Sequence, residues 1–452
     1  MVAFFKSPQS QRKRKAPTHQ IMKGVSIDRL DHQGVGVSRQ RDPVVLVEGA
    51  LPDETVNVSV TQQKSRFIKA SVTAVCTPSA ARVTPFCEHS AVCGGCQLDY
   101  IEPAELRLWR QDAIQTLLET TANVEPLNWL APITGNQLGY RRKARLATDA
   151  RNPQQRKLGY RAAQSSQVFR LNNCAVLTPS LQALLKPLQA WFDGCDQAQH
   201  VGHITLLEGE NNTLIQVRML RPLADKNQQA LLALAQLHRC VLVVERDNHR
   251  LQVLHGESAQ VTYSPQPQLE IPIGGNDFVQ VNHAVNQQMV AQVLAWLREY
   301  HGTGAKVLDL FCGTGNFSIP LARAGFHVQG IEGVNAMVQK ASDYAVSHAL
   351  AQCKFSCIDL NDTRATRSLL EDKADAVVLD PSREGAAVVC NELSPTRHPV
   401  VVYVSCNPAS FARDAKALVS RGYRLTQIGL VEMFPYTKHS ELISLFSAAT
   451  AQ

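Results

Sequence analysis

The sequence predicts a multidomain α/β protein in which a small β-barrel, a mixed α+β region and a doubly wound parallel sheet follow one another. Short alternating segments fill the first part, and one amphipathic helix with strand-like runs fills the middle. From about Phe278 onward, β-strands alternate with helical patterns. These changes divide the chain into a basic tail at 1–16, a barrel at 17–76, a central domain at 77–275 and a sheet domain at 276–452.

Composition narrows the class of protein. With 452 residues, 44% of them hydrophobic and 19% charged, the chain has room for several cores and is not disordered. No run of about eighteen apolar residues crosses a bilayer, and the first residues lack a signal-peptide pattern, so we expect a cytoplasmic protein without membrane contact. A net charge of +7 favours a polyanionic partner such as nucleic acid. Nothing calls for an obligate protein partner, so we expect a monomer.

The barrel is expected between about Ile21 and Val75. The runs "GVSI", "GVGV", "VVLVEG" and "TVNVSV" alternate, and turn residues such as Asp42-Pro43 separate them. An OB-like barrel of this size often offers a groove to RNA, although a packing module has the same composition. The preceding run "QRKRK" at 11–15 is either a solvated tail or an arm for phosphates.

The central region contains one clear helix and one basic stripe. "PAELRLWRQDAIQTLLETT" places five large residues on one helical face: Leu106, Trp109, Ile114, Leu117 and Leu118. "YRRKARLA", at 140–147, interleaves aromatic and cationic residues on a predicted strand. Such a stripe either stacks on bases and pairs with phosphates or is a solvated strand face.

Four cysteines of the central region form a candidate metal site. "CEHSAVCGGC" spaces Cys87, Cys93 and Cys96 as C-x5-C-x2-C, and Cys174 in "LNNCAVL" is the natural fourth ligand. Structural zinc sites usually use two short knuckles, whereas only one is present, so three clustered ligands and a remote one favour an iron–sulfur cluster. Spacing alone leaves both metals open.

The last third predicts a parallel sheet with the cofactor at its carboxyl edge. Its strands are expected at "AKVLDLF", "FHVQGIE", "CKFSCID", "ADAVVLD" and "PVVVYVS", with a terminal pair around "YRLTQIGLVEMF" and "ELISLFSA". "VLDLFCGTGNFSIPLA" gives a strand, a glycine-rich turn and a helix, and Glu332 ends the next strand. Ser318 replaces the third glycine of the dinucleotide fingerprint, and the carboxylate of Asp309 would repel a pyrophosphate. These two features favour S-adenosylmethionine over NAD.

Cys406 in "VVYVSCNP" follows a buried strand at that same edge. Residues 380–382 are "DPS" without the aromatic residue that methyltransferases of exocyclic amines often carry, so we do not expect amine chemistry; a pyrimidine C5 is another acceptor to consider. C5 is a weak nucleophile, and a thiolate that adds at C6 activates it. A base must then remove the C5 proton, and "PYTKHSELISLF" offers His439 and Glu441. The other sheet cysteines, Cys312, Cys353, Cys357 and Cys390, are expected to be small apolar core residues.

"SCNP" with a downstream "HSE", "FVQVN", "LDLFCGTGNFS" and "LDPSREG" together resemble the RNA uracil-5-methyltransferases over nearly the whole chain. The resemblance implies that Cys406 is the nucleophile and Glu441 the base. It also implies six cofactor contacts, of which Asp359 matches the family pattern least securely: Gln280, Phe311, Asn316, Glu332, Asp359 and Asp380.

Members of this family that act on rRNA resemble the chain further in "CGGCQ". For those members the resemblance implies a 4Fe-4S cluster on the four cysteines and a TRAM barrel that binds RNA. It therefore implies SAM-dependent C5-methylation of a uridine in 23S rRNA by a class I, Rossmann-like domain. Two alternatives remain: another rRNA site or tRNA as the substrate, or an RNA-binding module whose catalytic centre is inactive.

Overall fold

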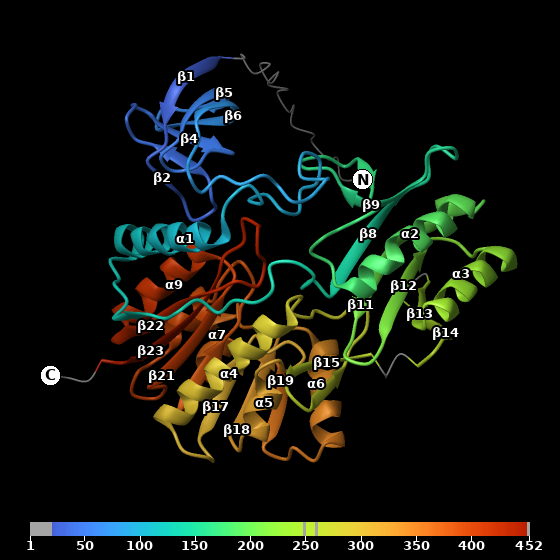
Figure 1. Ribbon diagram of the computed structural model, residues 1–452. Coiled ribbons are helices and arrows are strands. Elements are labelled where there is room, and N and C mark those ends of the chain that lie inside the picture. The colour runs from blue at the N-terminus through green and yellow to red at the C-terminus, as the bar shows by residue number, and fades with distance from the viewer. Residues whose placement is uncertain (1–19, 247–249, 258–260, 450–452) are drawn as a thin grey trace, which may run out of the picture. The chain divides into compact units, whose positions relative to one another are not determined.

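The computed structural model describes residues 20–246, 250–257 and 261–449, so the basic run at 11–15 lies outside the described residues. The chain divides into one unit that ends at Arg82 and a second that begins at Val83 (Figure 1). In the described ranges no helix is long and apolar enough to cross a membrane.

The first unit is a six-stranded sheet in the order β1-β5-β6-β4-β3-β2. Its strands are β1 (Ile21–Ser26), β2 (Arg29–Leu30), β3 (Gly36–Ser38), β4 (Val44–Glu48), β5 (Thr55–Gln63) and β6 (Phe67–Thr77). Valines alternate with polar residues along β4 and β5, so every second side chain enters one core. Val45, Val47, Val56 and Val58 are all fully buried there.

The second unit contains a seven-stranded sheet in the order β10-β9-β8-β11-β12-β13-β14. Its strands are β8 (Lys143–Asp149), β9 (Lys157–Arg161), β10 (Val168–Arg170), β11 (Val201–Glu208), β12 (Thr213–Met219), β13 (Cys240–Glu245) and β14 (Leu251–His255). Two helices and a 3-10 turn accompany it: α2 (Pro179–Gly194), α3 (Asp225–Leu237) and η2 (Ala198–His200). A hairpin of β15 (Thr262–Gln266) and β16 (Leu269–Pro272) follows.

The other sheet of this unit has eight strands in the order β19-β18-β17-β20-β21-β23-β22-β7. The strands are β7 (Asn128–Trp129), β17 (Lys306–Leu310), β18 (His327–Glu332), β19 (Cys353–Cys357), β20 (Ala376–Leu379), β21 (Val400–Ser405), β22 (Tyr423–Val431) and β23 (Glu441–Ala448). All seven strands predicted for the sheet domain are present. Neighbours from β19 to β21 are parallel, whereas β23 is antiparallel to both β21 and β22, so the predicted doubly wound sheet is confirmed.

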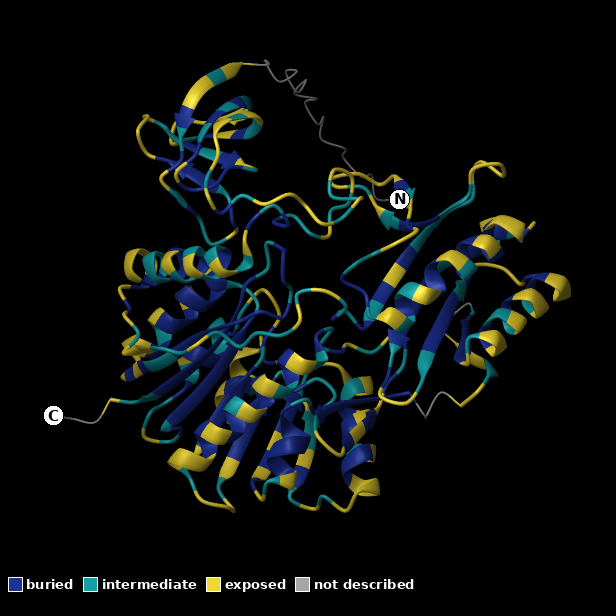
Figure 2. Ribbon diagram, in the orientation of Figure 1, coloured by how far each residue is buried: buried dark blue, intermediate teal, exposed yellow. Residues whose placement is uncertain are grey.

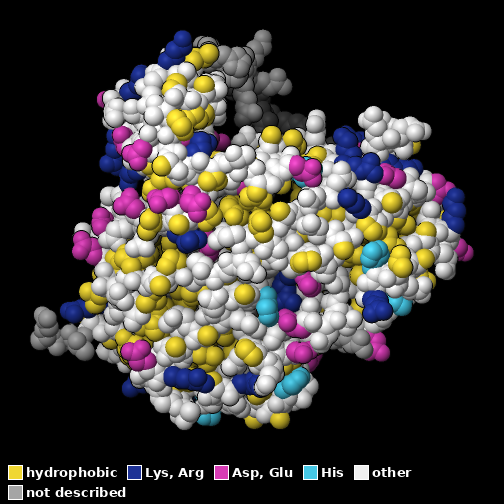
Figure 3. All heavy atoms as spheres, in the orientation of Figure 1, with side chains coloured by type: hydrophobic (Ala, Val, Ile, Leu, Met, Phe, Trp, Pro, Cys, Tyr) yellow, Lys and Arg dark blue, Asp and Glu magenta, His cyan; other side chains and the backbone are white. Residues whose placement is uncertain are grey.

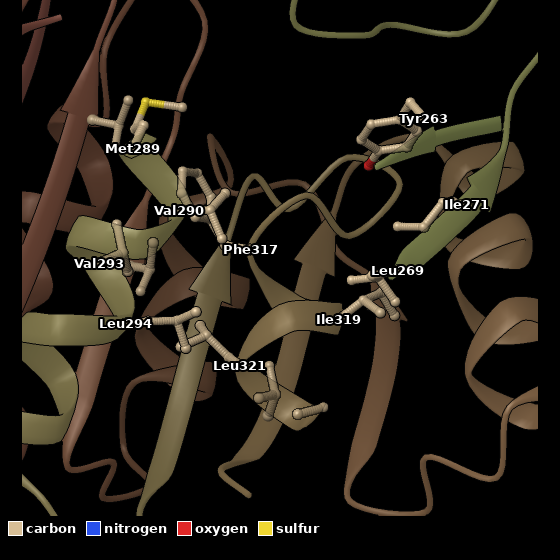
Figure 4. Packing of buried hydrophobic residues seen from close by; sticks show 14 of the residues in the cluster. Tyr263, Leu269, Ile271, Met289, Val290, Val293, Leu294, Phe317, Ile319 and Leu321 are labelled. Atoms are coloured by element: carbon tan, nitrogen blue, oxygen red, sulfur yellow. The ribbon is translucent and has the colours of Figure 1, made fainter. Parts of the chain in front are cut away.

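Helices cover both faces of this sheet (Figure 1). They are α4 (His283–Tyr300), α5 (Ser318–Arg323), α6 (Asn335–Ser347), α7 (Thr363–Leu369), α8 (Ala387–Glu392) and α9 (Pro408–Ser420). Because both faces are covered, β20 and β21 are buried along their entire length, as Figure 2 shows for the centre of the sheet. Figure 4 shows one of the two cores, where α4 residues such as Val290 and Leu294 pack against Phe317 and Leu321, and Leu269 of the hairpin packs against Ile319.

The predicted amphipathic helix is α1 (Pro103–Leu117), and a π-helical turn, η1 (Leu118–Ala122), continues it. Leu106, Ile114 and Leu118 are buried as expected, whereas Trp109 and Leu117 are only half-buried. Ile114 and Leu118 enter the core on the second face of the eight-stranded sheet, and β7 adds a parallel edge to β22. Residues before the predicted boundary at 276 therefore complete the last sheet.

Candidate active site

A cavity of about 580 Å³ lies at the carboxyl ends of the parallel strands of the eight-stranded sheet. Its walls come from the turn after β17, the end of β18, the loops after β19, β20 and β21, and the segment before α4. All eight residues to which the resemblance gives a catalytic or cofactor-binding role line it: Gln280, Phe311, Asn316, Glu332, Asp359, Asp380, Cys406 and Glu441.

The glycine-rich turn shapes one wall of the cavity. Phe311 has φ 65° and Gly313 has φ 57°, so the backbone turns sharply between β17 and α5. A phenylalanine in this left-handed region is strained, and such strain is concentrated at functional sites. The Glu332 carboxylate accepts hydrogen bonds from the backbone N–H groups of Gly313, at 3.1 Å, and Val334, at 3.0 Å. Both carboxylate oxygens are thereby held at the end of β18.

Two asparagines connect this wall to α4. The amide of Asn286 donates to Asn316 Oδ1 at 2.9 Å, and the amide of Asn316 donates back to Asn286 Oδ1 at 3.1 Å. Asn286 is buried and lies one turn into α4, which follows the segment that carries Gln280. This reciprocal pair fixes the Asn316 side chain, and the sequence offered no pattern that would have identified Asn286 as its partner.

The expected role of Asp309 toward the cofactor is wrong. Asp309 is fully buried and is absent from the lining of the cavity, because its side chain points into the core and accepts a hydrogen bond from the Ser318 hydroxyl. Burial raises the pKa of this carboxyl to about 7. Ser318 therefore replaces glycine to bind Asp309, and the pair joins β17 to the start of α5.

Cys406 stands at the junction of β21 and α9. Pro408 is the first residue of α9, and the Asn407 side chain caps the helix by accepting from the Ala409 N–H at 3.1 Å. The strand end and the helix cap together hold the Cys406 backbone, and its half-buried thiol faces the cavity.

Burial controls the protonation of the Cys406 thiol and of two carboxyl groups in the same cavity. Burial and the charges of Glu441 and Asp380 raise the pKa of Cys406 to about 11. Burial and the Asp380 charge raise the pKa of Glu441 to about 8, and burial with the charge of Asp309 raises the pKa of Asp380 to about 7. Among the described residues, one oxygen of Glu441, Oε2, has no hydrogen-bond partner. The thiol and most of the Glu441 carboxyl are therefore protonated at neutral pH, and Glu441 becomes a carboxylate as the pH rises past about 8.

Glu441 begins β23, and the loop before it is held by residues far away in the chain. The buried guanidinium of Arg110, on α1, donates to the Thr437 carbonyl. The Leu98 N–H donates to the Tyr436 carbonyl at 2.8 Å, and the Lys438 N–H donates to Gln97 Oε1 at 3.2 Å. The predicted apolar face of α1 missed Arg110, because a cationic side chain at a buried position gives no apolar signal.

His439 was the other candidate base. It is absent from the lining of the cavity, and its Nε2 lies 3.1 Å from the guanidinium of Arg383. Burial and the nearby arginines, Arg383 first, lower the pKa of His439, so the imidazole is neutral. Between the two candidates, Glu441 is the group that reaches the cavity.

The four cysteines of the candidate metal site lie in loops beside β9 and β10. All four are free and half-buried: Cys87, Cys93, Cys96 and Cys174. The pKa of Cys96 is raised to about 12 by burial and then by the charges of Cys174, Asp99, Cys93 and Cys87, so these groups lie within electrostatic reach of one another. In the described part of the chain, no group of three or more His, Cys, Asp or Glu side chains is arranged to hold a metal ion.

Two smaller expectations need correction. Cys357 is exposed because it ends β19, the edge strand of the sheet, whereas Cys312, Cys353 and Cys390 are buried as expected. The basic stripe does not face the solvent along its whole length, since Tyr140 and Arg142 are buried. Arg142 donates to Glu210 Oε1 at 2.9 Å and to the Glu208 carbonyl at 2.9 Å, so it joins parts of the protein rather than facing a partner.

Comparison with known proteins identifies the family of the chain. A family model described as tRNA (Uracil-5-)-methyltransferase matches residues 162–448, more than half of the chain. The chain is 41% identical to the 23S rRNA (uracil(1939)-C(5))-methyltransferase RlmD of Alteromonas naphthalenivorans, over 94% of this chain and 89% of that protein. It is 36% identical to the protein of the same name from Vibrio parahaemolyticus, over 96% and 98%.

Among solved structures, the chain is similar to the tRNA (uracil-54, C5)-methyltransferase of Pyrococcus abyssi in complex with S-adenosyl-L-homocysteine. The TM-score is 0.69 at 21% identity, and the match covers 94% of this chain and all of that one, which shows that the fold is shared. The family model covers more than half of the chain and the relatives match nearly all of it, so the chain belongs to the RNA uracil-5-methyltransferase family.

Proposed function

We propose that this enzyme transfers the methyl group of S-adenosylmethionine to C5 of a uridine in 23S rRNA, at the position that its curated relatives number 1939. The observation that carries the proposal is the meeting of Cys406, Glu441 and the six expected cofactor contacts in one cavity. S-adenosylmethionine is also the cofactor class of the structural relative, which was solved with S-adenosyl-L-homocysteine.

The residues of the cavity fit such a cofactor. Glu332 ends the second strand with both oxygens oriented by backbone N–H groups, as is suitable for two ribose hydroxyls. A Cβ on Gly313 would meet nothing within 4 Å, so the turn is open to a ligand. Four carboxyl groups line the cavity and favour a cationic ligand: Glu332, Asp359, Asp380 and Glu441. When bound there, the cofactor supplies an electrophilic methyl group.

The chain's own residues perform the remaining steps. The Cys406 thiol passes its proton to solvent, and Sγ adds to C6 of the uracil, which places negative charge on C5 and O4. After C5 has accepted the methyl group, Glu441 removes the C5 proton, and the electron pair of that C–H bond expels the thiolate from C6. The raised pKa of Glu441, about 8, suits a group that must take up a proton near neutral pH and release it again.

A 23S rRNA fragment that carries 5-fluorouridine at the target position tests this function. Fluorine cannot leave as a proton, so the methylated adduct should remain bound to Cys406, where peptide mapping by mass spectrometry would find it. Cys406→Ala should give neither adduct nor product. Methylated product from the Cys406→Ala variant, or methylation of tRNA in preference to the 23S fragment, would contradict the mechanism or the substrate respectively.

We further propose that Cys87, Cys93, Cys96 and Cys174 hold a 4Fe-4S cluster. Two thiols already accept backbone N–H groups, since His89 N lies 3.4 Å from Cys87 Sγ and Gly95 N lies 3.3 Å from Cys93 Sγ. Such hydrogen bonds stabilise thiolate ligands of iron–sulfur clusters. Protein isolated without oxygen should contain iron and acid-labile sulfide, and Cys96→Ser should lose both. Stoichiometric zinc without sulfide would contradict this proposal.

We also propose that the first unit is a TRAM-type barrel that binds RNA. Lys64 and Lys69 lie 5.4 Å and 5.8 Å from the ring centre of Phe67, which is a cation–aromatic group of the kind that binds bases and phosphates. On the face seen in Figure 3, basic side chains are interspersed with acidic ones. The double variant Lys64→Ala/Lys69→Ala should bind the rRNA fragment more weakly, by filter binding, and unchanged affinity would contradict an RNA contact at this barrel.

A further inference from the structure

A second pocket, of about 620 Å³, adjoins the catalytic cavity. It lies between the loop after β20 and the first turn of α9, and no step of the proposed mechanism uses it. Arg383 and Asn361 line both spaces, so these two residues lie at the border between the cavity and the pocket.

Arg383 has an unusual position in the charge pattern of the cavity. Among the described residues it is the one lysine or arginine that lines the cavity, against four carboxyl groups. It is exposed, and its guanidinium contacts the neutral ring of His439 at 3.1 Å rather than a carboxylate. Its backbone carbonyl accepts from the Asn407 amide at 2.9 Å, so the residue beside Cys406 fixes the loop that carries it.

Arg413 supplies a second cation to the neighbouring pocket. It donates from Nε to Asp414 at 2.8 Å and from Nη2 to the Glu384 carbonyl at 2.7 Å, and about half of its side chain is exposed. The pocket also contains hydrogen-bonding groups of Asn361, Asn407 and Ser410, and one acid, Glu384. Arg413 is paired with the buried Asp414 and keeps exposed N–H groups, whereas the Arg383 guanidinium is paired with a neutral ring. Two guanidinium groups with neutral donors beside them are the chemistry that binds a phosphodiester.

We propose that Arg383 and Arg413 form a phosphate subsite, which binds the RNA backbone beside the target uridine while the base enters the cavity. The proposal rests on the function proposed above. A uracil above Cys406 brings its own phosphates with it, and these cannot lie among the four carboxyl groups of the cavity. Among the described residues that line the cavity, Arg383 is the one cation that could stabilise such a phosphate, and Arg413 lines the pocket beside it.

Arg383→Gln tests the subsite, because it removes the charge at an exposed position without emptying a core. We expect KM for a 23S rRNA fragment to rise about tenfold, with kcat changed less than threefold, since a charge-assisted phosphate contact is lost. The slope of the logarithm of the RNA binding constant against the logarithm of the salt concentration should decrease in magnitude by about one. Arg383→Lys should recover part of the loss. Lys416→Gln, which removes an exposed charge one turn further along α9, should leave KM unchanged.

A chemical change in the RNA separates this subsite from other roles of Arg383. A fragment with a neutral methylphosphonate beside the target uridine should bind the unsubstituted enzyme about tenfold more weakly and Arg383→Gln no more weakly than the natural fragment. If the losses of affinity caused by the methylphosphonate and by Arg383→Gln add to each other, the two groups do not interact and the proposal is overturned. A fall in kcat with unchanged KM for Arg383→Gln would also overturn it, because the guanidinium would then act on the uracil ring. Absence of methylation of any 23S fragment by the unsubstituted enzyme would instead refute the proposed function.

Discussion

Replacing Glu441 by glutamine should lower the rate of methyl transfer and, at the same time, raise the chemical reactivity of the Cys406 thiol. The substitution keeps the size of the side chain but removes both the base and a negative charge that raises the pKa of Cys406. Turnover should fall by about 10²–10⁴-fold, which is the usual contribution of a general base. The Cys406 thiol, in contrast, should become more reactive, because its thiolate no longer faces this carboxylate.

The size of the second effect follows from the two pKa values. At about pH 9, Glu441, with a pKa of about 8, is mostly charged, and a thiol with a pKa of about 11 is on the order of 1% ionised. Loss of one close like charge should lower the thiol pKa by about one unit, which raises the thiolate fraction roughly tenfold. Below about pH 7 the carboxyl is protonated, so the variant and the unsubstituted enzyme should react alike.

Iodoacetamide labelling of Cys406, followed by peptide mass spectrometry between about pH 6 and pH 10, measures this difference. Glu299→Gln, which removes an exposed acid on α4, is the matched control and should leave the labelling profile unchanged. With ordinary uridine RNA and cofactor, Glu441→Gln should also accumulate a covalent protein–RNA complex. Labelling at pH 9 that is unchanged or slower, or turnover that is retained, would refute the electrostatic coupling and the role of the base.

Three further outcomes follow from the packing around the site. Gly330→Ala should lower the free energy of unfolding by about 1–3 kcal/mol and weaken cofactor binding, because the new Cβ would lie 2.5 Å from the Phe355 ring and 3.0 Å from Cys312 Sγ. Urea unfolding measures the loss. If adding Phe355→Leu to Gly330→Ala recovers no stability, the clash with the ring is not the cause. Asp309→Asn should stabilise the protein relative to the unsubstituted chain as the pH rises from about 4 to 7. The Asp309 carboxyl has a pKa of about 7 in the folded protein, so it ionises at lower pH in the unfolded chain, and the unsubstituted protein loses up to about 1.4 kcal/mol of stability per pH unit in this range. Equal stabilities of the two proteins at pH 7 would show that the folded-state pKa of Asp309 is not raised. Arg110→Met should lower the free energy of unfolding by about 1–3 kcal/mol and lower kcat, because the Thr437 carbonyl loses its buried donor and the loop before Glu441 becomes less ordered. Unfolding and kinetic measurements on this variant and on Arg110→Lys test the prediction. Full kcat in the methionine variant would exclude a role of Arg110 in holding the loop.

The parallel sheet and most of the residues that line its cavity could be predicted from local sequence. Strands such as Val400–Ser405 are continuous apolar runs, and the chemistry-bearing residues directly follow them, so the topology brings Cys406, Asp380 and Glu332 to one edge. Glu441 was predictable for a similar reason, as an acid at the start of an apolar strand. The resemblance in motifs added the roles, which geometry alone does not give.

Other parts of the site depend on contacts between distant segments and gave no local signal. Asn286 is one polar residue on a helix, and only the fold shows that it holds Asn316. Arg110 interrupts an apolar face, yet it donates to a carbonyl more than three hundred residues away. Asp309 was placed on the correct strand but given the wrong direction, because strand alternation is not visible in a run buried on both faces.

The short strand β7 has a consequence for biosynthesis. Residues 128 and 129 of β7 pair with residues 427 and 428 of β22, so β7 is synthesised some three hundred residues before the strand with which it pairs. Until then the backbone of β7 lacks the strand with which it pairs in the folded chain. The eight-stranded sheet can close only after the segment that forms β22 has been synthesised, which is a contact of long sequence separation and slows folding.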